Sequence, residues 1–180
     1  YDVFNRRIGR KLDTTSPFDM TNATIDRYVY DDISNGWASF EGGNVVLDFV
    51  DPDGSGGQAM TMSKRYLYSE AVDQILAQED LSKALGDATR VLWPLVDQLG
   101  TVRDLAKQDG TIAVHYKYDS YGNVTSGDTS KTRYLFTSRE FDTATKLQYN
   151  RARWYDGGVV RWICEDPLGY KLHFMRSLCS

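Results

Sequence analysis

The chain has 180 residues and a formal net charge of −4, and 41% of its residues are hydrophobic. This length and hydrophobic content suit one ordinary domain with a buried core. No cluster of Lys and Arg is long enough to form a basic patch, which argues against nucleic acid as a partner. No apolar run approaches the length of a membrane-spanning helix, so we predict no membrane span.

Tyrosine dominates the aromatic residues, with 12 Tyr against 7 Phe and 4 Trp. Because tyrosine joins an apolar ring to a polar hydroxyl group, it favours strands of a sheet that is only partly buried. Cys164 and Cys179 are too few for a disulfide framework; their spacing allows a bridge between them, but we expect two unpaired thiols. With only two histidines, a zinc site has almost no ligands, so we predict no metal and no cofactor.

The first half of the chain predicts short strands separated by turns. Residues 1–13 read as two strands with a turn near Asn5, and 27–31 (RYVYD) read as another strand. Residues 44–50 and 60–68 predict two strands around the glycine-rich loop 51–57. The chain begins with Tyr1 rather than Met, and no charged-then-apolar leader comes before it, so we expect a fragment or processed piece.

The middle of the chain is less uniform. Residues 72–77 fit a short strand or a helical turn, since so brief an apolar run does not decide between them. Residues 81–87 have a helical leaning or form a loop. Residues 90–96 and 101–107 predict a hairpin around the turn Asp-Gln-Leu-Gly. Pro94 has no N–H group, so its strand is expected to lie near an edge or a bulge.

A clearer hairpin is predicted at residues 115–126. Tyr116 and Tyr118 fall on one face by the strand period of two. The carboxylate of Asp119 can accept hydrogen bonds from backbone N–H groups that follow it. Gly122-Asn123 can supply the left-handed conformations of a tight turn.

Residues 133–170 predict a further set of hairpins. Aromatic-rich alternating segments are interrupted by the turns Asp-Thr-Ala-Thr at 142–145 and Asp-Gly-Gly at 156–158, and they stop at Asp-Pro-Leu-Gly, 166–169. Turn signals recur about every dozen residues along the chain, which is typical of an all-β array. We predict consecutive antiparallel hairpins that form one curved, spiralling sheet with little helix.

These motifs resemble the RHS (YD-repeat) family, in its carboxyl-terminal repeats and its RHS repeat-associated core. Residues 116–123 match the Tyr-x-Tyr-Asp-x-x-Gly-Asn repeat, and the later motifs match the core patterns GREYD, RARYYD, GRF and DPxG. The residues that carry the resemblance are Leu99, Gly100, Arg103, Tyr116, Tyr118, Asp119, Gly122, Asn123, Arg139, Asp142, Arg153, Tyr155, Asp156, Arg161, Asp166, Pro167 and Gly169.

The resemblance implies a strip of hairpins that wraps into a hollow shell. In that family the core plugs the carboxyl-terminal end, and the shell encloses a toxin-like domain or serves as an extracellular module. Residues 1–65 would be degenerate repeats and 66–180 a last repeat plus the front of the core, in one continuous unit. The implied partners are upstream repeats and a carboxyl-terminal domain of the same polypeptide, in a secreted or cell-surface protein.

The physical properties of β-hairpins favour such a stacked assembly. A lone hairpin is marginal in water, whereas stacked hairpins bury each other's aromatic faces. A long sheet of this kind must coil because strands twist. If the chain folds alone, its first strand exposes an edge, which predicts poor solubility or self-association.

Asp166 is the one catalytic candidate. The family core cleaves itself at an aspartic-protease-like site, and Asp166 matches an aspartate of that site by resemblance. However, Glu165 stands where cleaving members often have arginine, and the second core motif, Asp-Pro-x-Gly-Leu, at which they are cut, is absent. The fragment is therefore not expected to be an enzyme, and autoproteolysis would need a longer chain. The alternative is that Asp156 and Asp166 cap a turn and a strand end.

Two further interpretations concern surface residues. The four tryptophans, Trp37, Trp93, Trp154 and Trp162, could stack on sugars, so the rival function is an extracellular carbohydrate-binding or adhesion module. Their even scatter favours packing within the sheet instead. Arg151 and Arg153, two residues apart on one predicted strand face, could form salt bridges with Glu140 or Asp142 across the hairpin.

Overall fold

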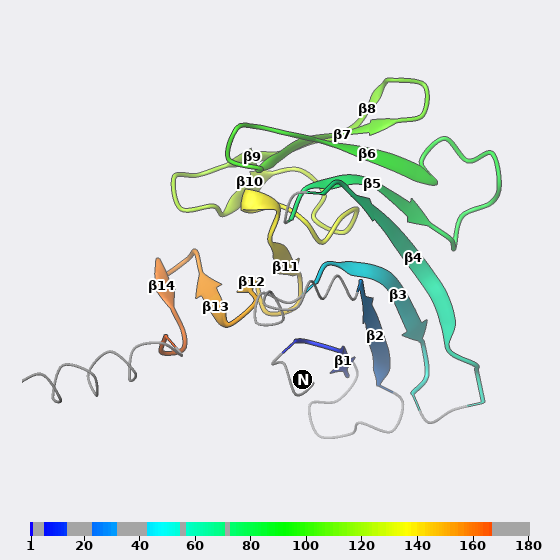
Figure 1. The fold of residues 1–180 in the computed structure, drawn as a ribbon, viewed down its shortest axis with the longest axis horizontal. Helices are drawn as coiled ribbons and strands as arrows, with labels where there is room; N and C mark the ends of the chain where they lie inside the picture. The colour runs from blue at the N-terminus through cyan, green and yellow to red at the C-terminus, as the bar shows by residue number, and fades with distance from the viewer. Residues whose placement is uncertain (2–5, 14–22, 32–42, 55–56, 71–72, 167–180) are drawn as a thin grey trace, which may run out of the picture.

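The structure, a computed structural model, describes residues 1, 6–13, 23–31, 43–54, 57–70 and 73–166. Its main feature is an eight-stranded antiparallel sheet in which each strand pairs with its neighbour in sequence, and which does not close into a barrel (Figure 1). The strands are β1 (Gly9–Leu12), β2 (Thr24–Tyr30), β3 (Val45–Asp51), β4 (Thr61–Tyr68), β5 (Ile75–Asp80), β6 (Val91–Val96), β7 (Val102–Lys107) and β8 (Ile112–His115).

Two smaller antiparallel sheets follow. The first pairs β9 (Lys117–Tyr118) with β10 (Val124–Ser126), and the second has the order β11-β12-β13-β14. Its strands are β11 (Glu140–Asp142), β12 (Leu147–Asn150), β13 (Arg153–Asp156) and β14 (Arg161–Trp162). A 3-10 turn, η1 (Phe136–Ser138), comes just before β11. The predicted all-β fold of consecutive hairpins is confirmed, and the main sheet continues through β4 across position 65.

The structure resolves the two undecided segments. Ile75–Asp80 is a strand, and the stretch after it, 81–87, forms turns rather than a helix. Pro94 lies inside the sheet, where it is paired with Leu105 of β7, but β5 pairs only with Val91 and Leu92. The proline therefore lies beyond the pairing with β5, where a missing N–H group does no harm.

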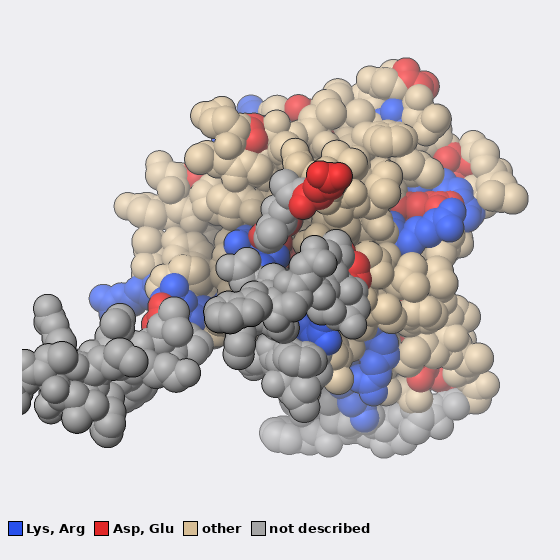
Figure 2. Space-filling model, in the orientation of Figure 1, with Lys and Arg blue, Asp and Glu red and all other residues tan. Residues whose placement is uncertain are grey.

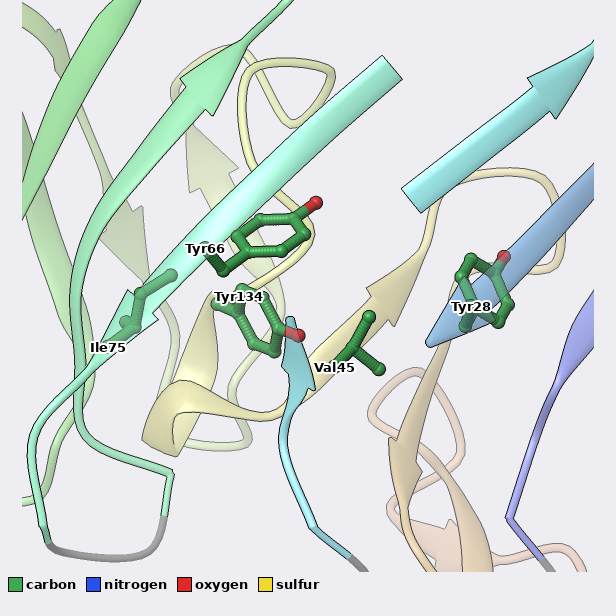
Figure 3. Packing of buried hydrophobic residues seen from close by; sticks show 5 residues of the cluster. All are labelled: Tyr28, Val45, Tyr66, Ile75 and Tyr134. Atoms are coloured by element: carbon green, nitrogen blue, oxygen red, sulfur yellow. The ribbon is translucent and has the colours of Figure 1, made fainter. Parts of the chain in front are cut away.

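The main sheet curves, and η1 and β11 lie on its concave side (Figure 1). Two apolar clusters fill the space between them. One contains Tyr28, Val45, Tyr66, Ile75 and Tyr134, and Figure 3 shows Tyr66 of β4 beside Tyr134. The other contains Leu92, Val102, Leu105, Tyr116 and Leu135. Each cluster joins the sheet to residues 134–135, so this late segment completes the core of the early strands.

Some predictions lie outside the described residues: the turn at Asn5, the tip of the loop at 55–56, Trp37, Cys179, and Pro167 and Gly169 of the last motif. Cys164 is a free and exposed thiol. Within the described residues, no helix has the length and apolarity that crossing a membrane would require.

Candidate functional site

A layer of paired charges joins the first strands to the segment that contains β11. We call it the arginine layer, and it consists of Arg7, Arg10, Asp26, Asp48, Arg133, Glu140 and Asp142. The guanidinium of Arg7 donates to Glu140 Oε2 at 2.7 Å and to Asp142 Oδ2 at 3.2 Å, across 133 and 135 residues of sequence. Arg10 lies 2.7 Å from Asp26 and 3.2 Å from Asp142. Asp142 is thus held by two arginines.

The second centre of the layer is Arg133. Its Nη2 lies 3.1 Å from Asp48 Oδ2, and its Nη1 lies 3.6 Å from Glu140 Oε2. The hydroxyl group of Tyr66 donates to the same Asp48 oxygen at 2.7 Å. Asp48 is 6% exposed, and a buried carboxylate is tolerated only when it is paired and hydrogen-bonded. Glu140 links the two centres because it contacts both Arg7 and Arg133.

Aromatic rings enclose the guanidinium groups. Arg7 lies 5.1 Å from the ring centre of Tyr28, 5.3 Å from that of Trp154 and 5.4 Å from that of Tyr149. The guanidinium of Arg133 also lies over the Tyr28 ring, 4.2 Å from the ring centre. A guanidinium is weakly hydrated and stacks well on aromatic faces, which is why arginine suits this half-apolar interface.

The layer shifts the pKa values of its members in opposite directions. Burial raises the pKa of Asp48 above its usual value, and the nearby charge of Arg133 only partly offsets this effect. Burial also acts to raise the pKa of Asp142, but Arg10, two backbone N–H groups and Arg7 outweigh it, so the pKa lies below its usual value. Burial acts to lower the pKa of Arg7, but Glu140 and Tyr28 together outweigh it, so the pKa lies above its usual value.

A second seam, largely uncharged, runs along β5 to β7. The amide of Gln78 donates to the carbonyl oxygen of Lys131 at 2.6 Å, and the backbone N–H of Val102 donates to Leu135 at 3.0 Å. The hydroxyl group of Ser138 donates to the carbonyl oxygen of Gly100 at 2.6 Å. Segment 131–138 is therefore attached to the sheet by hydrogen bonds as well as by apolar packing.

The turn between β9 and β10, which we call the YD turn (residues 119–123), makes a third contact between distant segments. Asp119 accepts hydrogen bonds from the N–H groups of Tyr121 and Asn123 at 2.8 and 3.0 Å, as predicted. Gly122 has φ of +88°, and a Cβ atom there would lie 2.5 Å from the Phe136 ring, whereas Asn123 has no positive φ. Asn123 instead donates through its side chain to the carbonyl oxygen of Gly157 at 2.9 Å. The repeat turn is thus fastened to the β13–β14 turn.

Aspartate plays the same part in turn after turn. In each of these turns, one carboxylate oxygen accepts a hydrogen bond from the N–H group two residues ahead, an arrangement typical of Asp. The residues are Asp51, Asp80, Asp87, Asp97, Asp109, Asp119, Asp128, Asp142 and Asp156. The alternative reading of Asp156 as a turn cap is therefore confirmed.

Three other motif residues, Leu99, Gly100 and Arg103, lie in or beside the turn between β6 and β7. Gly100 has φ of +77° and ends the β6–β7 turn, where Leu99 is 66% exposed. Arg103 lies 2.9 Å from Asp97 of that turn and 5.4 Å from the ring centre of Tyr118. Tyr118 donates its hydroxyl hydrogen to the carbonyl oxygen of Val102 at 2.7 Å. The β6–β7 hairpin and the β9–β10 hairpin therefore contact each other.

The arginines of the later motifs do not pair as the sequence suggested. Arg139 and Arg151 both bind Asp73, at 2.7 and 2.9 Å, in the turn between β4 and β5. Arg151 lies in a turn with φ of +58°, not on a strand face, so it cannot act as the predicted cross-strand partner. Glu140 and Asp142 have the arginine layer as partners instead.

Asp166 lies at the end of the described chain, beside Arg153 at 3.1 Å, and its side chain is 45% exposed. The Arg153 guanidinium also lies 4.1 Å from the ring centre of Trp162. Tyr155 packs on Trp162, with ring centres 5.4 Å apart, and donates to the carbonyl oxygen of Tyr121 at 3.3 Å. Arg161 of β14 lies opposite Asp156 of β13 in the strand register. These motif residues build the outer hairpin of the four-stranded sheet.

Sequence reasoning missed Arg7, Arg10, Asp48 and Arg133. Only Asp48 carried a local signal, since it is a charge in the middle of the apolar strand Val45–Asp51. On the face shown in Figure 2, Lys and Arg occur in small groups among uncharged surface. Among the described residues, no group of three His, Cys, Asp or Glu side chains could hold a metal ion.

No protein-family model matches the chain. The uncharacterized Escherichia coli K12 protein YibJ is 24% identical over 129 residues, which cover 70% of this chain and 55% of YibJ. The uncharacterized protein YlbH of the same strain is 34% identical over 68 residues, which cover 36% of this chain and 29% of YlbH. The chain thus spans about half the length of YibJ and under a third of YlbH.

Solved structures of Tc toxin chains share the fold. The TcdB2–TccC3 crystal structure without its hypervariable C-terminal region gives a TM-score of 0.63 at 18% identity, covering 92% of this chain and 7% of that chain. The TcdB2–TccC3-TEV crystal structure gives 0.63 at 16%, covering 94% and 8%. The Photorhabdus luminescens Tc holotoxin pore gives 0.62 at 15%, covering 94% and 7%. At these identities the similarity is one of fold, shared with parts of much longer toxin chains.

Proposed function

We propose that this chain is a structural segment of an RHS (YD-repeat) shell and that, in the intact protein, it helps to enclose a carboxyl-terminal, toxin-like domain. The observation that carries the proposal is the arginine layer. It holds a segment with core-like motifs against the first strands of a curved sheet, 133 residues earlier. The similarity in fold to the TcdB2–TccC3 structures supports the same conclusion.

In this proposal the motif residues act structurally, at turns and seams, and the segment is not itself an enzyme. Its partners are upstream repeats and the enclosed domain of the same polypeptide, in a secreted or cell-surface protein. Asp166 would contribute to self-cleavage only in a longer chain. Comparing that longer chain with its Asp166→Asn variant on a gel tests the point, and equal cleavage in both removes Asp166 from the mechanism.

The shell itself is tested by expressing the chain with any coding sequence that flanks it and digesting the product with a protease. We expect the downstream domain to survive in the parent protein and to be cut in the Arg7→Met variant, whose layer is broken. Arg65→Met is the matched control, because the Arg65 side chain is 60% exposed. Rapid digestion of the downstream domain in the parent protein contradicts enclosure.

A second candidate, carbohydrate binding, has one observation in its favour. Trp93 of β6 is 40% exposed, and its indole N–H group donates to Gln108 at 3.4 Å. An exposed indole face is the platform on which a sugar ring could stack. A glycan array with the parent chain and Trp93→Ala tests this candidate, and an array on which the parent binds nothing removes it.

A further inference from the structure

A pocket of about 310 Å³ lies between β1 and the four-stranded sheet β11–β14. Arg7, Arg10 and Asp142 of the arginine layer form part of its wall. Pockets that bind small ligands start at about this volume and combine an apolar lining with a few polar groups. None of the turn and seam roles described above needs an open pocket here.

The apolar wall has a fixed aromatic face. Trp154 packs on Tyr149, with ring centres 4.9 Å apart, and its indole N–H group donates to the hydroxyl group of Tyr1 at 3.1 Å. Leu12 and Leu147 add aliphatic surface from β1 and β12. Because the indole is held on two sides, it offers a stacking surface at little cost in side-chain entropy.

The charged wall favours an anion. The charges of Arg7 and Arg10 are offset by Asp26, Glu140 and Asp142. Lys11 is exposed, and within the described part of the chain it has no ion pair. An anionic group that enters the pocket would supply a counterion to Lys11, whereas a cation would meet the positive charge of Lys11.

We propose that this pocket binds a carboxylate carried on an apolar or aromatic body, with the carboxylate at Lys11 and the body against Trp154. A free aryl carboxylate and the carboxyl-terminal residue of a peptide share this chemistry. The assignment goes beyond the shell function and does not depend on it.

The test uses the 180-residue chain and two pairs of probes: 3-phenylpropionate and its amide, and the peptide Gly-Gly-Phe with a free or an amidated terminus. The indole N–H signal of Trp154, assigned by its loss in Trp154→Phe, reports binding in NMR titrations. We expect a dissociation constant of about 1 mM or lower for at least one acid. The matching amide should bind about tenfold more weakly, because it lacks the charge-assisted contact.

Three variants locate the site. Lys11→Met should weaken binding of the acid about tenfold and leave the amide unchanged, while Lys117→Met, an exposed lysine of β9, should change neither. Ala144→Trp fills the pocket mouth from an exposed position and should abolish binding, with circular dichroism as the check that it folds.

Whichever acid binds more tightly, 3-phenylpropionate or the free peptide, identifies the source of the ligand. Equal binding of acid and amide, no saturable shift up to about 10 mM, or full affinity in Lys11→Met overturns the proposal.

Discussion

The two ends of the main sheet are attached to the late segment by different forces. At β6 to β8 the contact is an apolar cluster, in which Val102 and Leu105 are completely buried. At β1 to β3 it is the arginine layer, where each charge depends on its partners. Apolar packing is non-directional and depends on area and volume, whereas a buried ion pair is sensitive to the loss of either member.

This contrast indicates separate roles. The apolar end supplies stability that hardly varies with salt or pH, and the charged end specifies which strands the late segment covers. We therefore expect variants at the two ends to differ in size of effect and in their dependence on solution conditions.

The largest effect is expected for Arg133→Met, which leaves Asp48 buried without its cation. We expect the free energy of unfolding to fall by about 3–5 kcal/mol, measured by urea denaturation. Adding Asp48→Leu should recover much of the loss, because the uncompensated charge is then gone. Arg65→Met, at an exposed pair, is the control and should cost at most about 1 kcal/mol. A loss as small as that of the control contradicts a charge-dependent seam.

At the apolar end, Leu105→Ala should cost about 3 kcal/mol, since it removes a completely buried side chain and leaves a cavity. The loss should hardly change with pH, since no charged group takes part, whereas the loss of Arg133→Met should shrink as acid protonates the unpaired Asp48. Leu99→Ala, at a side chain that is 66% exposed, should change stability by less than about 0.5 kcal/mol. A strong pH dependence of the Leu105→Ala loss would remove the distinction between the two ends.

Acid should act on the charged end. The folded state binds the proton of Asp142 less tightly than the unfolded chain does, because its pKa lies below the usual value. Its contribution is therefore complete above about pH 4 and is lost as the pH falls through the folded pKa. Asp48, with a raised pKa, acts in the opposite direction and partly offsets this loss.

Urea unfolding of the parent and of Asp142→Asn between about pH 6 and pH 3 measures this contribution. We expect the parent to lose stability more steeply, by at most about 1.4 kcal/mol per pH unit for one group. If the free energy of unfolding falls equally steeply with pH in the parent and in Asp142→Asn, protonation of Asp142 does not contribute to the loss of stability in acid.

The smallest of these effects is expected at the YD turn. Asp119→Ala removes hydrogen bonds to two backbone N–H groups in an exposed turn and should cost about 1 kcal/mol. Asn123→Ala should instead speed hydrogen exchange locally, at the β13–β14 turn to which its side chain is bound. No change at that turn would mean that the contact does not join the two hairpins in solution.

The strands and turns were predictable because their signals are local. The alternation of Tyr116 and Tyr118, and aspartates such as Asp119 and Asp142, act on residues only two to four positions away. Residues 72–77 were ambiguous because so brief an apolar run fits a strand or a helical turn, and the strand that forms is Ile75–Asp80. Arg151 was placed on a strand face, yet a positive φ turns it towards Asp73.

The arginine layer could not be predicted in the same way. Arg7 and Glu140 are 133 residues apart, and the residues next to each in the sequence give no sign that the two are partners. Only the curvature of the sheet, which is set by the accumulated twist of its strands, brings them together. Asp48 was readable as a misplaced charge, but its partner Arg133 was not.

The most direct measurement is a double-mutant cycle between Arg7→Met and Glu140→Gln, since this pair links the first strands to the late segment. The free energies of unfolding of the parent, the two single variants and the double variant give the coupling energy between the side chains. We predict a coupling of at least about 1 kcal/mol, as for residues of one buried network. Additive effects, within about 0.3 kcal/mol, would contradict the account that buried arginines hold the late segment on the sheet.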